Sequence, residues 1–204
     1  MFELDARLYS LQGQLAVIYG GGLHTKHRHT RYHDFFTRRV QAGERVLDIG
    51  CGNGALTRDI AEHAGAEVTG IDLAEANIAV ARQRHPHPRV RYLVGDALSD
   101  LPDERFDVIV MSNVLEHLDQ RSAFLRQVQA RYLPARWLIR VPLFERDWRV
   151  PLKRELGVEY RLDPTHLIEY TQEAFASELC EAGLQIAHQE IRWGEIWAEV
   201  RCLP

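Results

Sequence analysis

Residues 45–64 constrain the fold of this chain more than any other part of the sequence. The apolar run 45–49 predicts a buried strand. Gly50, Gly52 and Gly54 then follow at alternate positions, and glycine lets the backbone turn sharply and lets a ligand approach without meeting a Cβ. In the residues after the third glycine, apolar side chains recur at helical spacing. The free amides at the start of such a helix favour an anionic group, so the run predicts a ligand site.

Two classes of cofactor use a loop of this kind. Gly50, Gly52 and Ala55 fit the dinucleotide fingerprint, which accepts alanine at its last position. Asp48, two residues before the first glycine, argues against it, since a carboxylate repels a pyrophosphate and attracts a ligand that carries ammonium and sulfonium groups. The run Asp48-Ile49-Gly50-Cys51-Gly52-Asn53-Gly54 resembles the glycine-loop motif of the class I S-adenosylmethionine (SAM)-dependent methyltransferases.

The resemblance implies an α/β fold, a doubly wound seven-stranded, mostly parallel sheet with one antiparallel strand near an edge, as in the Rossmann-like methyltransferase fold. We expect a helical cover over residues 1–42 and the SAM-binding domain over 43–204, with a substrate-shaping insertion at about 142–168. The strands are predicted at 45–49, 67–71, 90–94, 106–111, 136–141, 184–191 and 195–202.

Acids follow the second and third predicted strands. Asp72 comes about 20 residues after the glycine loop, where a carboxylate binds both hydroxyls of a ribose, in NAD and, by resemblance, in SAM. Asp96 is either a turn residue or, as the resemblance implies, the acceptor for the adenine amino group, with Ala97 beside the ring. The residues predicted to bind SAM are Arg28, Asp48, Gly50, Cys51, Gly52, Gly54, Asp72, Leu73, Asp96, Ala97, Ser112 and Asn113.

A basic run at residues 24–33 precedes the first strand. In the methyltransferases that this chain resembles, this segment folds over the cofactor, so Arg28 or Arg31 is a candidate for the carboxylate of SAM. A solvated basic face is the plain alternative. His29 and His33, one helical turn apart, would make a metal pair, but nothing nearby completes a ligand set. We expect no metal requirement.

The fourth predicted strand opens into Ser112-Asn113-Val114-Leu115-Glu116-His117-Leu118. This run resembles the branch of the family that acts on small molecules such as quinone precursors. His117 is therefore either a catalytic or substrate-contacting residue near the transferable methyl, or a helix-start histidine bonded to the backbone. In the insertion, Asp163 and His166 are either a base with its orienting partner or a turn cap.

The composition favours some classes of binding partner and one cellular compartment over others. A net charge of −4 and a pI of about 6.2 argue against a nucleic-acid partner. Three scattered cysteines favour a reducing compartment, and no apolar run is long enough for a membrane span, so we expect a cytoplasmic protein. Residues 2–19 predict an amphipathic helix that either covers the domain or forms a homodimer contact.

The predicted function is methyl transfer from SAM to an oxygen, nitrogen or carbon, most simply of a small molecule. Two alternatives are an NAD(P)-dependent oxidoreductase and a non-catalytic SAM-binding protein. The first is disfavoured by Asp48 and by the lack of a second domain for a substrate. The second rests on the fact that cofactor binding alone is not catalysis.

Overall fold

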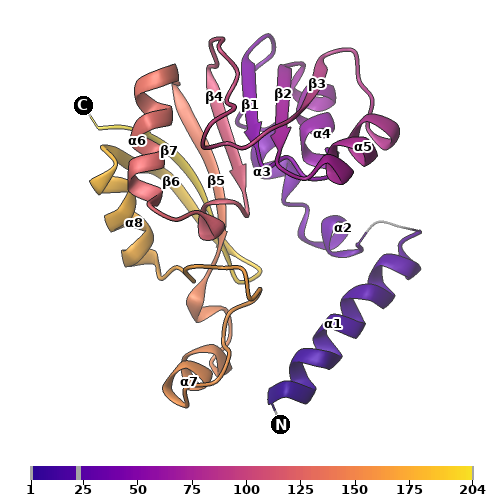
Figure 1. Ribbon diagram of the computed structural model, residues 1–204, viewed down its shortest axis with the longest axis vertical. Coiled ribbons are helices and arrows are strands. Elements are labelled where there is room, and N and C mark those ends of the chain that lie inside the picture. Colours follow the sequence, from indigo (N-terminus) through magenta and orange to yellow (C-terminus); the bar gives the residue numbers. More distant parts are fainter. Residues whose placement is uncertain (1, 22–23, 204) are drawn as a thin grey trace. The chain divides into compact units, whose positions relative to one another are not determined.

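Seven strands form one sheet in the order β3-β2-β1-β4-β5-β7-β6 in a computed structural model that describes residues 2–21 and 24–203 (Figure 1). All neighbouring strands pair in parallel except β7, which runs antiparallel to both β5 and β6. The predicted seven-stranded, mostly parallel sheet is therefore confirmed, and its antiparallel strand lies next to the edge.

Helices and strands alternate along most of the chain. In order, they are α1 Phe2–Tyr19, α2 Lys26–Thr30, α3 His33–Thr37, β1 Arg45–Ile49, α4 Ala55–Ala64, β2 Glu67–Asp72, α5 Glu75–Arg84, β3 Val90–Val94, β4 Val108–Ser112, η1 Leu115–His117, α6 Arg121–Tyr132, β5 Arg136–Pro142, η2 Phe144–Arg146, α7 Arg149–Glu155, α8 Gln172–Glu181, β6 Leu184–Arg192 and β7 Glu195–Cys202. None of the helices described within 2–21 and 24–203 is long and apolar enough to span a membrane.

Alternation along β1 sorts its side chains between the two faces of the sheet. Leu47 and Ile49 join the main core cluster, to which α6 and α8 contribute Phe124 and Phe175. Asp48, between them, bonds to Thr57 of α4 and so points to the opposite face. Helices therefore cover both faces of β1, which is why this strand is buried from its second residue onward.

The chain divides into two compact units, Met1–Phe35 and Phe36–Pro204. The first unit holds α1, α2 and the start of α3, and the second holds the sheet. The basic run does not form one continuous helix, because Arg31 adopts a left-handed conformation with φ 50° between α2 and α3. His29 and His33 are consequently not one turn apart on the same helix, which corrects that expectation. Gly22, in the glycine run that follows α1, lies outside the described residues.

The sheet reverses its strand order between β1 and β4. In open α/β sheets, ligands bind beyond the carboxyl ends of the strands at such a reversal. The glycine loop leaves β1 at this point and residues 113–118 leave β4 there. The topology thus brings the two segments singled out in the sequence to one edge of the sheet.

We expect Gly54→Ala to destabilise the fold more than Gly43→Ala does. Both glycines have nearly the same φ, +80° and +81°, so both alanines carry the left-handed strain of roughly 1–2 kcal/mol. At Gly54 a Cβ also lies 2.7 Å from the Tyr92 hydroxyl and 2.8 Å from the Ala81 Cβ, whereas at Gly43 it meets nothing within 4 Å. Overpacking adds about 1–3 kcal/mol. Denaturant unfolding measures the difference, and equal losses would contradict this packing.

Candidate functional site

The glycine loop is clamped on one side and open on the other. Gly50, Gly52 and Gly54 all have positive φ, between 54° and 80°. A Cβ on Gly50 would lie 2.4 Å from a methyl carbon of Val114, so the loop packs directly against the segment that follows β4. A Cβ on Gly52 would meet nothing within 4 Å. The backbone of Gly52 is therefore the part of the loop that a ligand can approach.

Asp72 fixes the open part of the loop from the end of β2. Its Oδ2 accepts a hydrogen bond from the Gly52 amide at 2.8 Å, and its Oδ1 accepts from the Ala74 amide and from the Asn77 side chain. The predicted ribose-binding carboxylate is thus also a structural clamp on the loop. Because a carboxylate has about four acceptor positions, these three bonds leave room for a ligand hydroxyl.

Asp48 lies beneath the loop rather than at its surface. It is 1% exposed, and its Oδ2 accepts from the Thr57 hydroxyl at 2.6 Å. Burial raises the pKa of the Asp48 carboxyl to about 7, the hydrogen bond from Thr57 opposes this, and the charge of Asp72 adds to it. Asp48 therefore gains its charge close to neutral pH. A direct contact between Asp48 and a ligand stays a prediction.

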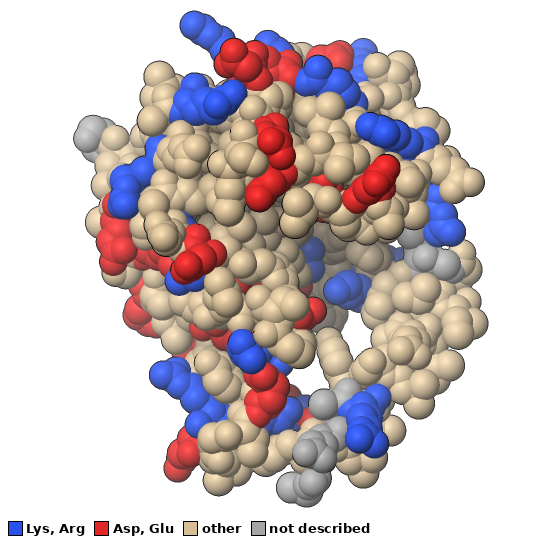
Figure 2. Space-filling model, in the orientation of Figure 1, with Lys and Arg blue, Asp and Glu red and all other residues tan. Residues whose placement is uncertain are grey.

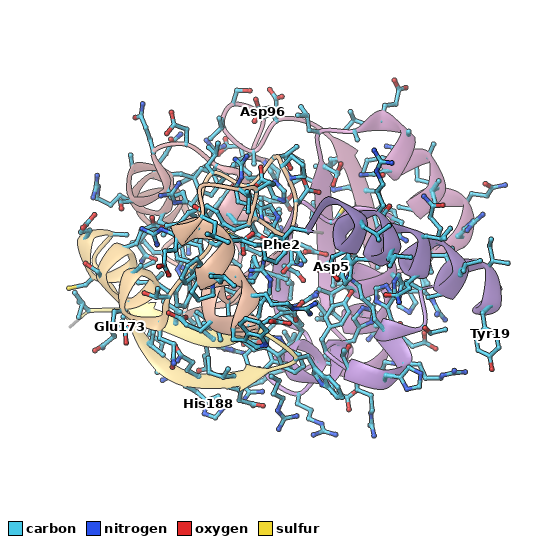
Figure 3. All side chains as sticks on the ribbon, turned by 90° about the horizontal axis from the view of Figure 1, so that it is seen from below. Phe2, Asp5, Tyr19, Asp96, Glu173 and His188 are labelled. Atoms are coloured by element: carbon cyan, nitrogen blue, oxygen red, sulfur yellow. The ribbon has the colours of Figure 1, made fainter. Side chains whose placement is uncertain are left out.

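Other predicted cofactor residues border the same edge in different ways. Cys51 is buried and its sulfur faces Gly70, so only its backbone faces the loop. Leu73, after Asp72, is 73% exposed. Asp96, in the loop after β3 (Figure 3), accepts from the Leu98 amide, and Ala97 packs against the core. Asp96 thus serves as a turn residue, and its adenine contact stays a prediction.

Ser112 and Asn113 stand at the end of β4. Ser112 Oγ accepts from Arg140, a buried arginine of β5 that also forms a two-pronged ion pair with Glu195. Asn113 has a left-handed backbone, φ 56°, and its amide bonds to the Arg140 carbonyl. The Asn113 side-chain oxygen is buried without a partner among the described residues. This strained, unsatisfied residue marks the β4 end as a place for a ligand.

His117 is held through its Nδ1. That nitrogen lies 3.0 Å from the Thr165 hydroxyl oxygen, and the hydroxyl itself donates to Asp163 at 2.7 Å. Burial, and then the neighbouring His166, lower the pKa of the His117 imidazole. Asp163 also accepts from the Thr165 amide, so it takes the turn-capping role and reaches His117 through Thr165.

His166 is buried and has a different partner from the one the sequence suggested. Its Nδ1 lies 2.9 Å from Glu169, which also pairs with Arg146 and accepts from the Leu162 amide. Glu169, and not Asp163, therefore orients His166, which corrects that pairing. The two predicted catalytic histidines come together, with ring centroids 4.6 Å apart and the rings nearly perpendicular.

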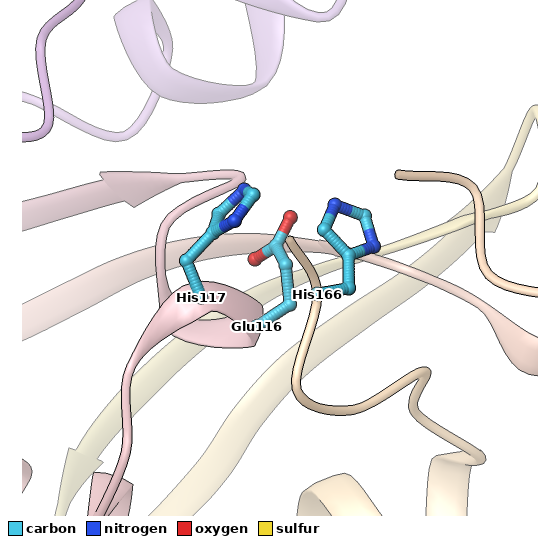
Figure 4. A group of neighbouring side chains, drawn as sticks. All are labelled: Glu116, His117 and His166. Carbon is cyan, nitrogen blue, oxygen red and sulfur yellow. The ribbon is translucent and has the colours of Figure 1, made fainter. Parts of the chain in front are cut away.

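Glu116 completes this group (Figure 4). Its carboxylate is fully buried and has no hydrogen-bond partner on either oxygen within the described part of the chain. Burial raises the pKa of the Glu116 carboxyl to about 7. Neither Glu116 nor Glu169 is among the site residues predicted from the sequence. Glu116 stands beside His117 and Glu169 stands three residues after His166, so each acid was detectable from its spacing to a predicted site residue.

Arg28 and Arg31 belong to the first compact unit. Arg31 pairs with Asp34 at 2.7 Å within that unit. Their contact with the carboxylate of a ligand stays a prediction.

Comparisons with known proteins agree on one family. A family described as "Methyltransferase domain" matches residues 47–134. The chain is 34% identical to a ubiquinone biosynthesis O-methyltransferase of Pseudomonas entomophila, over 59% of this chain and 53% of that protein. It is 33% identical to the protein of the same name from Pseudomonas putida, over 73% of this chain and 68% of that one. The chain thus spans about half the length of the first relative and two thirds of the second.

A solved structure extends the likeness to the fold. A TehB-like SAM-dependent methyltransferase from Corynebacterium glutamicum superposes with a TM-score of 0.63 at 19% identity, over 99% of this chain and all of that one. At this level of identity the likeness concerns the fold alone.

The raised pKa of Asp48 predicts a pH dependence of stability. Between about pH 4 and pH 7 the native state holds a proton on Asp48 that the unfolded state has lost, so this residue makes stability fall as pH rises. Asp48→Asn removes the ionisable group and with it this contribution to the pH dependence of stability. We expect the free energy of unfolding of the variant, minus that of the wild type, to increase from pH 5 to pH 8. Exposed Asp103→Asn is the control and should give a flat difference, and a flat difference for Asp48→Asn would contradict the assignment.

Proposed function

Since the chain belongs to the SAM-dependent methyltransferase family, we propose that it transfers a methyl group from SAM to an oxygen of a small-molecule acceptor. The observation that carries the proposal is the open backbone of Gly52, which Asp72 holds in a loop that also packs, at Gly50, against Val114 after β4. The names of the relatives support oxygen among the three acceptor atoms that the sequence left open. They give no support to a nicotinamide-dependent oxidoreductase.

The residues at this edge fit SAM. The space above Gly52 admits a ligand that any side chain there would displace, and Asp72 beside it suits a ribose diol. The unpartnered oxygen of Asn113 suits a donor such as the ligand's ammonium group. Asp48 places a carboxyl that charges near neutral pH beneath the loop, on the side where a cationic ligand stabilises the charged form.

Bound SAM supplies an already activated methyl group on a sulfonium. The task left to the chain is mainly to position the acceptor and exclude water. The segment that carries His166 is tied to η1, because the Leu167 amide donates to the Glu116 carbonyl at 2.8 Å. This segment therefore lies against the residues that follow β4, where it would shape an acceptor site. If the acceptor hydroxyl must lose a proton, His117 and His166 are the side chains placed to influence it.

The partners we propose follow from charge and exposure. Figure 2 shows acidic and basic side chains interspersed over the face in view rather than one basic patch, which supports a small molecule over a nucleic acid. The protein's location in the cytoplasm stays a prediction.

Substitution of Gly52 by alanine tests the cofactor site. Gly52 and Gly157 share a left-handed backbone, φ 54° and 66°, and at both a Cβ meets nothing within 4 Å. We therefore expect Gly52→Ala and Gly157→Ala to cost similar stability, roughly 1–2 kcal/mol. Only Gly52→Ala should weaken SAM binding, by at least tenfold, because its methyl occupies the ligand's approach. Calorimetric titration with SAM measures this, and equal affinity in both variants would overturn the proposed site.

We also propose that α1 is a homodimer contact. Leu4, Leu8, Leu11, Leu15 and Ile18, which are 49–73% exposed, support this, since exposed apolar patches mark interaction sites. Leu11→Glu should convert a dimer to a monomer in light scattering, whereas Ser10→Glu, which adds the same charge one position away, should not. A wild type that is monomeric would contradict the contact.

A further inference from the structure

We infer that Arg140, a buried arginine of β5, is a positioning residue for the carboxylate of SAM, on which it acts by fixing the direction of the Ser112 hydroxyl. This role rests on the proposed function, because the carboxylate belongs to the proposed cofactor. Arg140 itself does not touch the ligand. Its ion-pair partner Glu195 is part of the same device.

Arg140 is a charged residue in a buried, largely apolar strand. From the second residue of β5 onward every residue is buried, and Arg140 is 4% exposed. Its strand lies between β4 and β7 (Figure 1), and Arg140 is the register partner of Ser112 on β4 and of Trp197 on β7. Replacing a buried ion pair by apolar side chains of similar size is often neutral or stabilising. Arg140 therefore calls for an explanation other than the stability of the fold.

All three nitrogen atoms of the Arg140 guanidinium group have a defined partner. Nε and Nη2 donate to the two carboxylate oxygens of Glu195 at 2.7 and 2.6 Å, a two-pronged pair that fixes the plane of the group. Nη1 donates to Ser112 Oγ at 3.1 Å. Glu195 is anchored in turn, because its Oε2 also accepts from the Trp197 indole N–H at 2.9 Å. The guanidinium group is thus held in one orientation, with one arm directed at the end of β4.

Arg140 also holds the end of β4 through its backbone. Its carbonyl oxygen accepts a hydrogen bond from the Asn113 amide at 2.8 Å. Asn113 is the residue with a left-handed backbone and a buried side-chain oxygen that lacks a partner in the described part of the chain. One residue of β5 therefore positions two consecutive residues, Ser112 and Asn113, at the point where the chain leaves β4.

The bond from Arg140 decides how the Ser112 hydroxyl can act. An arginine side chain carries no acceptor, so Ser112 Oγ is the acceptor of this bond and keeps its own proton. No group within residues 2–21 and 24–203 accepts that proton. Ser112 is partly exposed at the carboxyl end of β4, so its O–H is a donor available to a ligand at this edge of the sheet.

Ser112 lies beside the start of the glycine loop. β1 and β4 pair in parallel with Ile49 opposite Met111. Gly50 and Ser112 are the next residues on the two strands, so the free hydroxyl stands next to the loop proposed to bind SAM.

The donor and the acceptor at the end of β4 complement an amino-acid group. Ser112 offers an O–H, and Asn113 offers a carbonyl oxygen. An amino-acid group presents a carboxylate, which only accepts, and an ammonium, which only donates. Since the ribose of SAM is assigned above to Asp72, the amino-acid end is the part left for β4. A carboxylate has about four acceptor positions, so it can also pair with Arg28 or Arg31 as predicted from the sequence.

A second buried ion pair on the same strand provides a matched control. Arg136, four residues before Arg140, pairs with Glu44 at 2.5 Å, and both side chains are mostly buried. Arg136 is the first residue of β5, so this pair stands at the amino end of the strand, away from the carboxyl edge of the sheet. It has the chemistry of the first pair without a hydroxyl of β4 to position.

The test compares SAM with decarboxylated SAM, which lacks the carboxylate and keeps the ammonium, the sulfonium and the nucleoside. Removing one partner of a buried ion pair leaves an unpaired charge, so the test variant carries Arg140→Met and Glu195→Gln together. We expect its affinity for SAM to fall at least tenfold, because a hydrogen bond to a charged group is weakened. Its affinity for decarboxylated SAM should change less than twofold. Calorimetric titration measures both, and Arg136→Met with Glu44→Gln should keep both within twofold of the wild type.

Substitution of Ser112 keeps the test decisive if the double substitution prevents folding, which a thermal melt detects. Ser112→Ala removes only the hydroxyl of a partly exposed residue and should cause the same selective loss of SAM affinity. Adding Arg140→Met and Glu195→Gln to Ser112→Ala should then cost no further affinity, because Arg140 acts through that hydroxyl.

The outcomes separate the two proposals. A wild type that binds neither SAM nor decarboxylated SAM overturns the proposed function and the role of Arg140 with it. If the wild type binds SAM, three results overturn the positioning role alone. These are equal losses for the two ligands in the Arg140 variant, unchanged SAM affinity in Ser112→Ala, and a loss of SAM affinity as large in the Arg136 control.

Discussion

The bond between the Asp72 carboxylate and the Gly52 amide holds together the part of the molecule on which its chemistry depends. It ties the end of β2 to the loop that leaves β1, and the same carboxylate caps the start of the α5 segment through Ala74 and Asn77. On its other side the loop rests on Val114, where only a glycine fits. The loop is therefore held between two strand ends, with one face of its backbone open.

Much of the fold follows from patterns that are local in the sequence. Runs of five to eight residues rich in apolar side chains predicted all seven strands, and several of their bounds agree with the structure to the residue, as at β1 and β3. Thr171, of a residue type that favours the start of a helix, caps α8 by accepting from the Ala174 amide. The short α7 within the predicted insertion was not predicted, because seven residues that include a proline show no helical period.

Which residues make up the site was less predictable, because the fold brings together side chains from separate segments. His117 and His166 were chosen separately, each from its own motif, and only the fold brings their rings together. Arg140 and Thr57 act through partners on other elements, so no spacing rule finds them, whereas Glu169 lies three residues after its partner His166. Asp48 was identified by its position before the glycines, but its burial, which decides when it is charged, is visible only in three dimensions.

Two buried carboxyls, Asp48 and Glu116, lie near the carboxyl ends of β1 and β4, and burial raises the free energy of the charged form of each. A nearby positive charge lowers the free energy of both buried carboxylates in their charged form. The charge of this edge therefore favours a cationic ligand such as the sulfonium cofactor proposed above. A site for an anionic dinucleotide would gain nothing from these two groups.

A thermal melt with SAM, S-adenosylhomocysteine, NAD and NADP in parallel tests the central claim most directly. A ligand that binds only the native state, present at 100 times its dissociation constant, adds about 2.7 kcal/mol of stability. The account predicts a rise in Tm with the two adenosyl ligands and none with the nicotinamide cofactors. A rise with NAD or NADP, and none with SAM, would contradict it.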